Sequence, residues 1–139
     1  MKAVLAALMI VAAHPCVAAE IKQARGAELR ILDKLSGVVT DQDLGVGQSK
    51  DDGRLTIRLD DCRYPVDQPN GEAFAHLTIT ENKGESPIFK GWMIASSPAL
   101  SALDHPRYDV WVLRCDVPEA AATDTATPDA TQTGNGSGG

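Results

Sequence analysis

The sequence predicts a small all-β domain, a sandwich or barrel of about six to eight short strands held by one disulfide. Turn signals built from Gly, Asp, Asn and Pro recur at short intervals between residues 27 and 117. The segments between these turns alternate apolar and polar residues, and none shows the spacing of a long amphipathic helix. A chain of 139 residues with this pattern is typical of one small domain with short flanking segments.

The flanking segments differ in composition from the predicted domain, residues 27–117. Residues 1–19 combine a basic start, an apolar run and a small-residue exit, which predicts a secretory signal peptide cleaved before Glu20. The apolar run is too short to span a bilayer, so no transmembrane segment is expected after cleavage. Residues 20–26 are expected to form a polar lead-in. Residues 118–139 contain no aromatic, Leu, Ile, Val or basic residue, which predicts a disordered tail.

Short strands and turns are expected at the beginning of the domain. Residues 29–34 predict one strand and residues 38–40 the next, separated by a turn at Ser36-Gly37. Residues 41–43, Asp-Gln-Asp, predict a second turn. We therefore expect the second strand to be interrupted before Leu44.

The clearest alternation follows an Asp-Asp-Gly turn signal and covers residues 54–59. Three residues of this strand share the face expected to line the core: Leu55, Ile57 and Leu59. If the alternation continued, the Cys62 side chain would lie on the opposite face of the strand from these three residues. Either the strand ends by Asp60, or a β-bulge at Asp60-Asp61 returns Cys62 to the inner face.

The carboxy-terminal half contains three further predicted strands. Residues 73–80 alternate, so that Phe74 and His76 point outward or into a second layer. Residues 88–95 include few polar side chains and are expected to be buried on both faces. Residues 108–115 close the domain. This last strand is expected to carry three residues on one face: Trp111, Leu113 and Cys115.

The cysteines predict one disulfide. Of three cysteines, Cys16 lies in the predicted signal peptide, which leaves Cys62 and Cys115. An even number of cysteines in an exported domain favours a Cys62–Cys115 bridge. Two unpaired buried thiols are the alternative, and a zinc site is disfavoured because two cysteines supply half of a ligand set.

The charge balance excludes several classes of partner. The chain has 13 Lys and Arg against 19 Asp and Glu, a formal net charge of −6, and no basic stripe. Nucleic acid and anionic membrane surfaces are therefore not expected as partners. The sequence also predicts no cofactor.

Three groups of polar residues have the residue types of chemical sites, but none is predicted to be catalytic or to bind a metal. The residue types of a hydrolase triad occur in Asp104, His105 and Asp109 with Ser96 or Ser97, but without a nucleophile-elbow sequence. A calcium site would gather acids and an amide without EF-hand spacing: Asp60, Asp61, Asp67, Glu72 and Asn70. His76 and His105 offer only two imidazoles for a transition metal.

Aromatic residues are concentrated in one segment although they make up only 4% of the chain. Four of them lie within a short stretch: Phe89, Trp92, Tyr108 and Trp111. Burial in the core is one interpretation. The other is a partly exposed surface for a partner, since Trp and Tyr are frequent anchors of interfaces.

The same segment carries a resemblance to a known family. Gly91-Trp92-Met93 and Ser96-Ser97-Pro98, followed by His105-Pro106 and Tyr108-Asp109-Val110-Trp111, resemble the signature of the bacterial domain-of-unknown-function family 2155. Over residues 27–115, Leu32-Asp33-Lys34, Gly53-Arg54-Leu55 and Cys62 fit the same pattern. Asp51-Asp52 stands where the pattern leads us to expect an apolar or aromatic residue. The resemblance implies an exported, periplasmic protein and supplies no catalytic residues.

These observations favour a non-catalytic interaction or accessory module of an envelope or membrane-bound assembly, with a periplasmic or membrane protein as its partner. The alternative is a soluble ligand- or glycan-binding module that uses the aromatic segment between Phe89 and Trp111. An enzyme is the least favoured class, because the sequence contains no catalytic motif.

Overall fold

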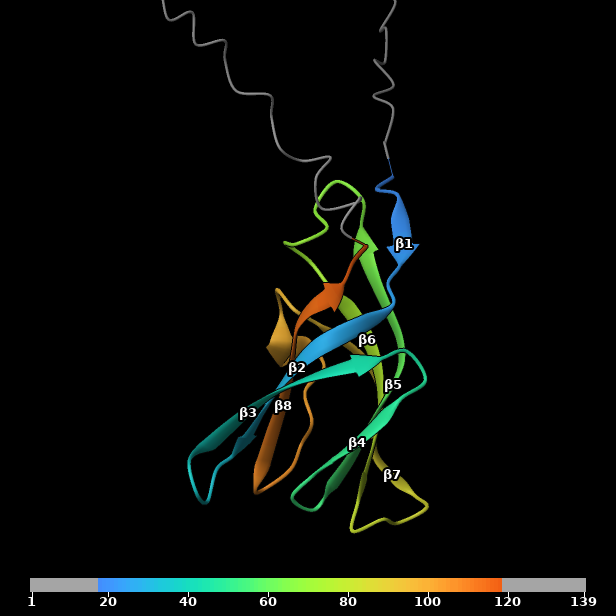
Figure 1. Ribbon diagram of the computed structural model, residues 1–139. Helices are drawn as coiled ribbons and strands as arrows, with labels where there is room; N and C mark the ends of the chain where they lie inside the picture. Colours follow the sequence, from blue (N-terminus) through green and yellow to red (C-terminus); the bar gives the residue numbers. More distant parts are fainter. Residues whose placement is uncertain (1–17, 119–139) are drawn as a thin grey trace, which may run out of the picture.

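Eight strands form two antiparallel sheets in the computed structural model, which describes residues 18–118 (Figure 1). The strands are β1 (Ile21–Gln23), β2 (Gly26–Asp33), β3 (Val38–Gly45), β4 (Ser49–Asp52), β5 (Leu55–Pro65), β6 (Phe74–Glu81), β7 (Pro87–Ile94) and β8 (Tyr108–Asp116). The five-stranded sheet has the order β1-β5-β6-β7, with β4 also on β5, and the three-stranded sheet has the order β3-β2-β8. A single 3-10 turn, η1 (Pro98–Leu100), lies between β7 and β8. The predicted all-β class is confirmed.

Two bends carry the chain from one sheet to the other. Between β1 and β2, the Ala24 amide donates to the carbonyl of Cys62 at 2.8 Å, and the Arg25 amide donates to the carbonyl of Asp116 at 3.1 Å. Between β3 and β4, the Gly47 amide donates to the carbonyl of Leu59 at 2.7 Å. These hydrogen bonds join the two sheets at the bends. The start of β1 and the end of β8 lie at the same end of the molecule (Figure 1).

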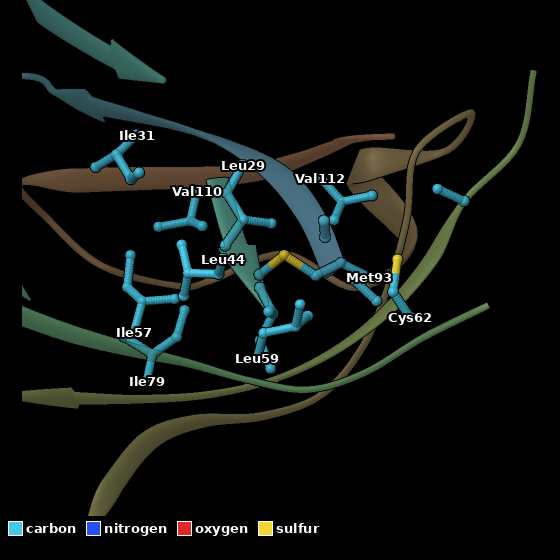
Figure 2. Packing of buried hydrophobic residues seen from close by; sticks show 14 of the residues in the cluster. Leu29, Ile31, Leu44, Ile57, Leu59, Cys62, Ile79, Met93, Val110 and Val112 are labelled. Carbon is cyan, nitrogen blue, oxygen red and sulfur yellow. The ribbon is translucent and has the colours of Figure 1, made fainter. Parts of the chain in front are cut away.

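Apolar residues from the inner faces of both sheets form one core. Figure 2 shows these side chains pointing toward one another between the two layers. Leu55, Ile57 and Leu59 of β5 are each at most 1% exposed, as the alternation predicted. Full burial of such a side chain stabilises the fold by roughly 1.5–3 kcal/mol.

A β-bulge in β5 brings Cys62 into this core. Leu59 is paired with Leu77 and Asp61 with His76, so Asp60 is the extra residue and the side-chain parity changes after it. Cys62 is fully buried, and its sulfur bonds to Cys115 of β8 with the Cα atoms 5.9 Å apart. Both the bulge and the predicted disulfide are confirmed. The bridge joins the two sheets and stabilises the fold by about 4 kcal/mol on the loop-entropy model.

One prediction about the first strands is wrong. Residues 41–43 form no turn, because β3 runs unbroken from Val38 to Gly45 and pairs with β2 along its whole length. The polar side chains that indicated a turn find partners instead: Asp41 accepts two 2.7 Å hydrogen bonds from Arg30, and Gln42 donates to Asp52 at 2.8 Å. Within the polar lead-in, residues 20–26, the chain forms β1.

A second bulge corrects the predicted face of β8. Arg114 pairs with Glu28 and Val112 with Leu29, so Leu113 is the extra residue. Cys115 is consequently buried with Val110 and Val112, while Trp111 lies on the outer face of the three-stranded sheet. Trp111 and Cys115 do not share a face, because one inserted residue inverts the alternation between them.

Strand β7 is not buried on both faces. Ile88 is 42% exposed and Trp92 is 37% exposed, whereas Met93 lies in the core. Among residues 18–118, no helix or strand covers the outer face of this sheet. No helix within this part of the chain is long and apolar enough to cross a membrane.

The β4–β5 hairpin accounts for the unexpected Asp51-Asp52. The carboxylate of Asp51 accepts a 2.6 Å hydrogen bond from Thr56, while that of Asp52 is bonded to Gln42. Gly53 turns the chain with a φ of +57°, and a Cβ on it would lie 2.5 Å from the Tyr108 hydroxyl. Polar pairing therefore replaces the apolar contact expected at this turn.

Candidate docking surface

The four aromatic residues of the predicted partner surface lie in different places. Tyr108 is in the core, 1% exposed, and its hydroxyl accepts a 3.3 Å hydrogen bond from the Arg54 amide. Phe89 is partly buried against the core. Trp92 lies on the outer face of the five-stranded sheet and Trp111 on that of the three-stranded sheet. They do not form one surface, and the prediction for Tyr108 is wrong because its strand parity turns it inward.

Trp92 has a set of neighbours that lie far from it in the sequence. Strand pairing places His76 beside Trp92, Phe74 beside Arg63, and Arg63 beside Gln23. Side chains on this outer face enclose a shallow depression of about 260 Å³. Its lining consists of Ile21, Arg63, Phe74 and Trp92. We call this face, with its depression, the Trp92 face.

The indole ring of Trp92 is held from two sides. The guanidinium carbon of Arg63 lies 5.0 Å from the ring centroid, a cation–π distance. The imidazole of His76 meets the ring edge-on, with centroids 5.2 Å apart and an interplanar angle of 78°. The ring is therefore fixed on the sheet while 37% of the residue stays exposed.

Two carboxylates of the β5 bulge anchor the polar side chains of this face. Asp61 accepts hydrogen bonds from Gln23 at 2.8 Å and from the Nε of Arg63 at 2.7 Å. Thus β1, which sequence reasoning did not predict, helps to place Arg63.

Asp60 joins three side chains of the same face. It accepts hydrogen bonds from Thr78 at 2.6 Å, from the Nε of Arg58 at 2.7 Å and from the Nδ1 of His76 at 3.1 Å. Burial alone would raise the pKa of Asp60, but the bonds from Thr78, Arg58 and His76 outweigh it and lower that pKa. Asp60 is therefore a carboxylate at neutral pH, and through His76 it supports the Trp92 ring.

Accessible charge on the Trp92 face is mainly positive. The side chains of Asp60 and Asp61 are 15% and 14% exposed, whereas those of Arg58 and Arg63 are 56% and 53% exposed. Lys90 of β7 is also exposed on this face. The carboxylates lie close to the sheet and the cations extend above them, so a ligand would meet the cations first.

The residues considered for a catalytic triad have other partners. The Nδ1 of His105 accepts hydrogen bonds from the amides of Arg107 and Tyr108 at 3.1 and 3.0 Å, and its Nε2 lies 3.4 Å from Glu81. Asp109 is paired with Lys34 at 3.0 Å. Ser96 donates a hydrogen bond to Glu72. In this arrangement His105 shapes the loop before β8, and Ser96 and Asp109 are bonded elsewhere.

The residues considered for metal binding are likewise dispersed. Asp60 and Asp61 are bonded as described above, and Glu72 accepts hydrogen bonds from Ser96 and Ala73. Among residues 18–118, no group of three or more His, Cys, Asp or Glu side chains is placed to hold a metal ion.

A second and larger depression of about 670 Å³ lies beside the end of β8, where Glu28, Asp43, Arg114 and Asp116 line it.

The fold and this surface define a disulfide-linked domain of two β-sheets with an exposed aromatic face. The chain belongs to the bacterial family described as "Uncharacterized protein conserved in bacteria (DUF2155)", whose model matches residues 27–115. The resemblance stated from the sequence is thereby confirmed. The uncharacterized protein RP359 of Rickettsia prowazekii (strain Madrid E) is 33% identical over 100 residues, which is 70% of this chain and 64% of that relative. No solved structure matches the chain.

Proposed function

We propose that this protein is an exported, periplasmic, non-catalytic interaction module that docks onto a partner protein of an envelope or membrane-bound assembly through the Trp92 face. The observation that carries the proposal is the fixed, 37% exposed Trp92 beside an apolar depression, on a sheet face that no helix or strand of residues 18–118 covers. Tryptophan and arginine are enriched among the residues that dominate binding energy at interfaces. A cluster of exposed apolar side chains next to charged ones is typical of such a site.

Export is supported by two independent features. Residues 1–19, most of which lie outside the described residues, have the composition of a secretory signal. The Cys62–Cys115 disulfide fits an oxidising compartment, where such bridges form and persist. Sequencing of the protein recovered from the periplasm should begin at Glu20, and a form that still contains Met1 would contradict cleavage.

A glycan-binding module is the second candidate, favoured by the polar groups of Gln23 and Asp61 beside an exposed tryptophan. Sugar rings, however, stack on an open aromatic face. One face of the Trp92 ring is covered by the Arg63 guanidinium at 5.0 Å, and His76 approaches the ring as well. The geometry therefore favours a protein partner.

The proposal is tested by photo-crosslinking in native envelopes, with a photoreactive residue in place of Ile88 and mass-spectrometric identification of the product. The protein with only the photoreactive residue should give a crosslinked product with a partner. The product should be lost when Trp92→Ala is added and retained when Trp111→Ala is added, the matched control on the other sheet. A crosslinked product that persists in Trp92→Ala, or that is lost in Trp111→Ala as well, would overturn the assignment of the Trp92 face.

A further inference from the structure

We infer that the Trp92 face binds an extended acidic segment of the partner, in which a large apolar side chain and a carboxylate lie within two residues of each other. The inference rests on the proposed function and adds the chemistry of the partner. The apolar side chain would enter the depression lined by Ile21, Phe74 and Trp92. The carboxylate would bind Arg63.

The depression has the size and lining for one side chain. Its volume is about 260 Å³, below the roughly 300–1,000 Å³ typical of sites for drug-sized ligands. Ile21 is 46% exposed and Trp92 is 37% exposed, so both have apolar surface left to bury. A large aliphatic or aromatic side chain of a partner would remove that surface from water.

Arg63 is oriented for a carboxylate before any ligand arrives. Its Nε is bonded to Asp61, which Gln23 holds in turn, and its carbon lies over the Trp92 ring. Among residues 18–118, no side chain accepts a hydrogen bond from the terminal amino groups of Arg63. A guanidinium with its plane fixed and an edge free suits a carboxylate, which it can bind with two parallel hydrogen bonds.

The distribution of charge supports an acidic partner. Next to the depression, Lys22 and Glu20 flank Ile21 as an ion pair of no net charge, with side chains 55% and 70% exposed. The other exposed cations are Arg63 and, further along the same face, Arg58 and Lys90. The exposed carboxylate of Asp51 lies on β4, beside the start of β5 and therefore away from Arg63 near the end of β5. It accepts a hydrogen bond from Thr56. A basic segment would therefore meet cations at the depression, whereas an acidic one would be attracted to it.

The spacing of the two contacts indicates an extended segment. Although β6 separates the strands of Arg63 and Trp92, the Arg63 guanidinium carbon lies 5.0 Å from the Trp92 ring centroid, so the two contacts are neighbours. Residues at alternate positions of an extended chain point to the same side, about 6.6 Å apart, a spacing that suits two neighbouring contacts. Residues 118–139 of this chain are acidic but contain no large apolar residue, so the depression suits a partner better than this tail.

The test uses the processed protein beginning at Glu20, in a Trp111→Phe background so that fluorescence reports Trp92 alone. The probe is a blocked heptapeptide with one Phe and, two residues later, one Glu. Binding should change Trp92 fluorescence. Replacing the peptide's Glu by Gln should weaken binding about tenfold, because the hydrogen bonds to Arg63 would lose their charged acceptor. Replacing its Phe by Ala should weaken binding to a similar degree.

Variants of the protein make the test specific. Arg63→Gln should lower affinity for the acidic peptide about tenfold and should abolish the difference between the Glu and Gln peptides. Arg114→Gln, a change of an exposed arginine on the other sheet, should leave affinity unchanged. Amide NMR spectra of each variant establish that the fold is retained.

The outcomes separate the inference from the proposed function. If no peptide binds, or if Glu and Gln peptides bind equally, the acidic-segment inference is wrong, while the crosslinking result for Trp92→Ala still decides the proposed function. If oligosaccharides from peptidoglycan change Trp92 fluorescence and the peptides do not, a glycan is the ligand and both proposals fail. If a second copy of the chain is the crosslinked product, the partner assignment is wrong.

Discussion

The outer faces of the two sheets each carry one tryptophan, but the charges around the two rings are arranged differently. Two pairs beside Trp111 are matched: Arg30 and Asp41 have side chains 43% and 40% exposed, and Lys34 and Asp109 have side chains 37% and 34% exposed. Toward the end of β8, Arg114 is 64% exposed above a Glu28 that is 19% exposed, but the depression that this pair lines does not include Trp111. Around Trp92, Arg63 is 53% exposed above an Asp61 that is 14% exposed.

The same residue types therefore surround the two rings in two ways: with both charges of a pair exposed beside Trp111, and with the carboxylate recessed beside Trp92. When both partners of an ion pair reach the surface equally, their fields largely cancel for an approaching molecule. When the carboxylate is recessed, it holds the arginine in place, while an approaching molecule meets the exposed arginine first. The β5 bulge places Asp60 and Asp61 in that recessed position.

The largest effect is expected from removing the bridge between the two sheets. Cys62→Ala with Cys115→Ala should lower the free energy of unfolding by about 4 kcal/mol. Hydrogen exchange should then rise more in the three-stranded sheet than in the five-stranded sheet, because β2 and β8 lose their covalent link to the larger layer. Urea unfolding and exchange mass spectrometry measure the two effects. Equal acceleration in both sheets would contradict the expected difference.

The next effect compares one turn glycine from each sheet. Gly53→Ala should destabilise by about 3 kcal/mol, because the residue has a φ of +57° and the new methyl group would lie 2.5 Å from the Tyr108 hydroxyl. Gly37→Ala has a similar φ of +73° but open space around it, so it should cost about 1 kcal/mol. Thermal unfolding distinguishes them. Similar losses would mean that backbone strain alone sets the cost.

The two tryptophans should separate stability from binding. Trp111→Ala should lower the free energy of unfolding by about 2 kcal/mol, less than the 3–5 kcal/mol of a core tryptophan because Trp111 is only partly buried. Trp92→Ala should cost about 1 kcal/mol, chiefly the lost contacts with Arg63 and His76, while it abolishes partner crosslinking. Chemical unfolding of both variants tests the stability difference. A larger loss for Trp92→Ala would place Trp92 in a structural role.

The smallest effect concerns acid stability on the side of the three-stranded sheet. Hydrogen bonds from Arg107 lower the pKa of Asp33 from 3.8 to about 2. Because this folded-state pKa is lower than the unfolded one, the stabilisation is present above about pH 4 and is lost as the pH falls toward 2. Asp33→Asn should lower the melting temperature at neutral pH and flatten its fall between pH 4 and pH 2. Asp67→Asn, in an exposed loop, is the control.

Three properties could be predicted from the sequence alone: the class of fold, the disulfide partners and the inner face of β5. These properties depend on local alternation, turn residues and the count of cysteines, all of which can be read along the chain. The outward direction of Phe74 and His76 followed from the same alternation. The position of Cys62 on the outer face of the predicted strand also pointed to a bulge at Asp60-Asp61, with the end of the strand by Asp60 as the alternative.

The positions of the two tryptophans depended on long-range strand pairing. Because side chains in a strand alternate with a period of two, the single inserted residue Leu113 reversed the face of Trp111 relative to Cys115. The depression beside Trp92 required β1 to pair with β5, a long-range contact made by a segment without a strand pattern of its own. Local sequence carries no record of such pairing, because its energy comes from residues that are distant along the chain.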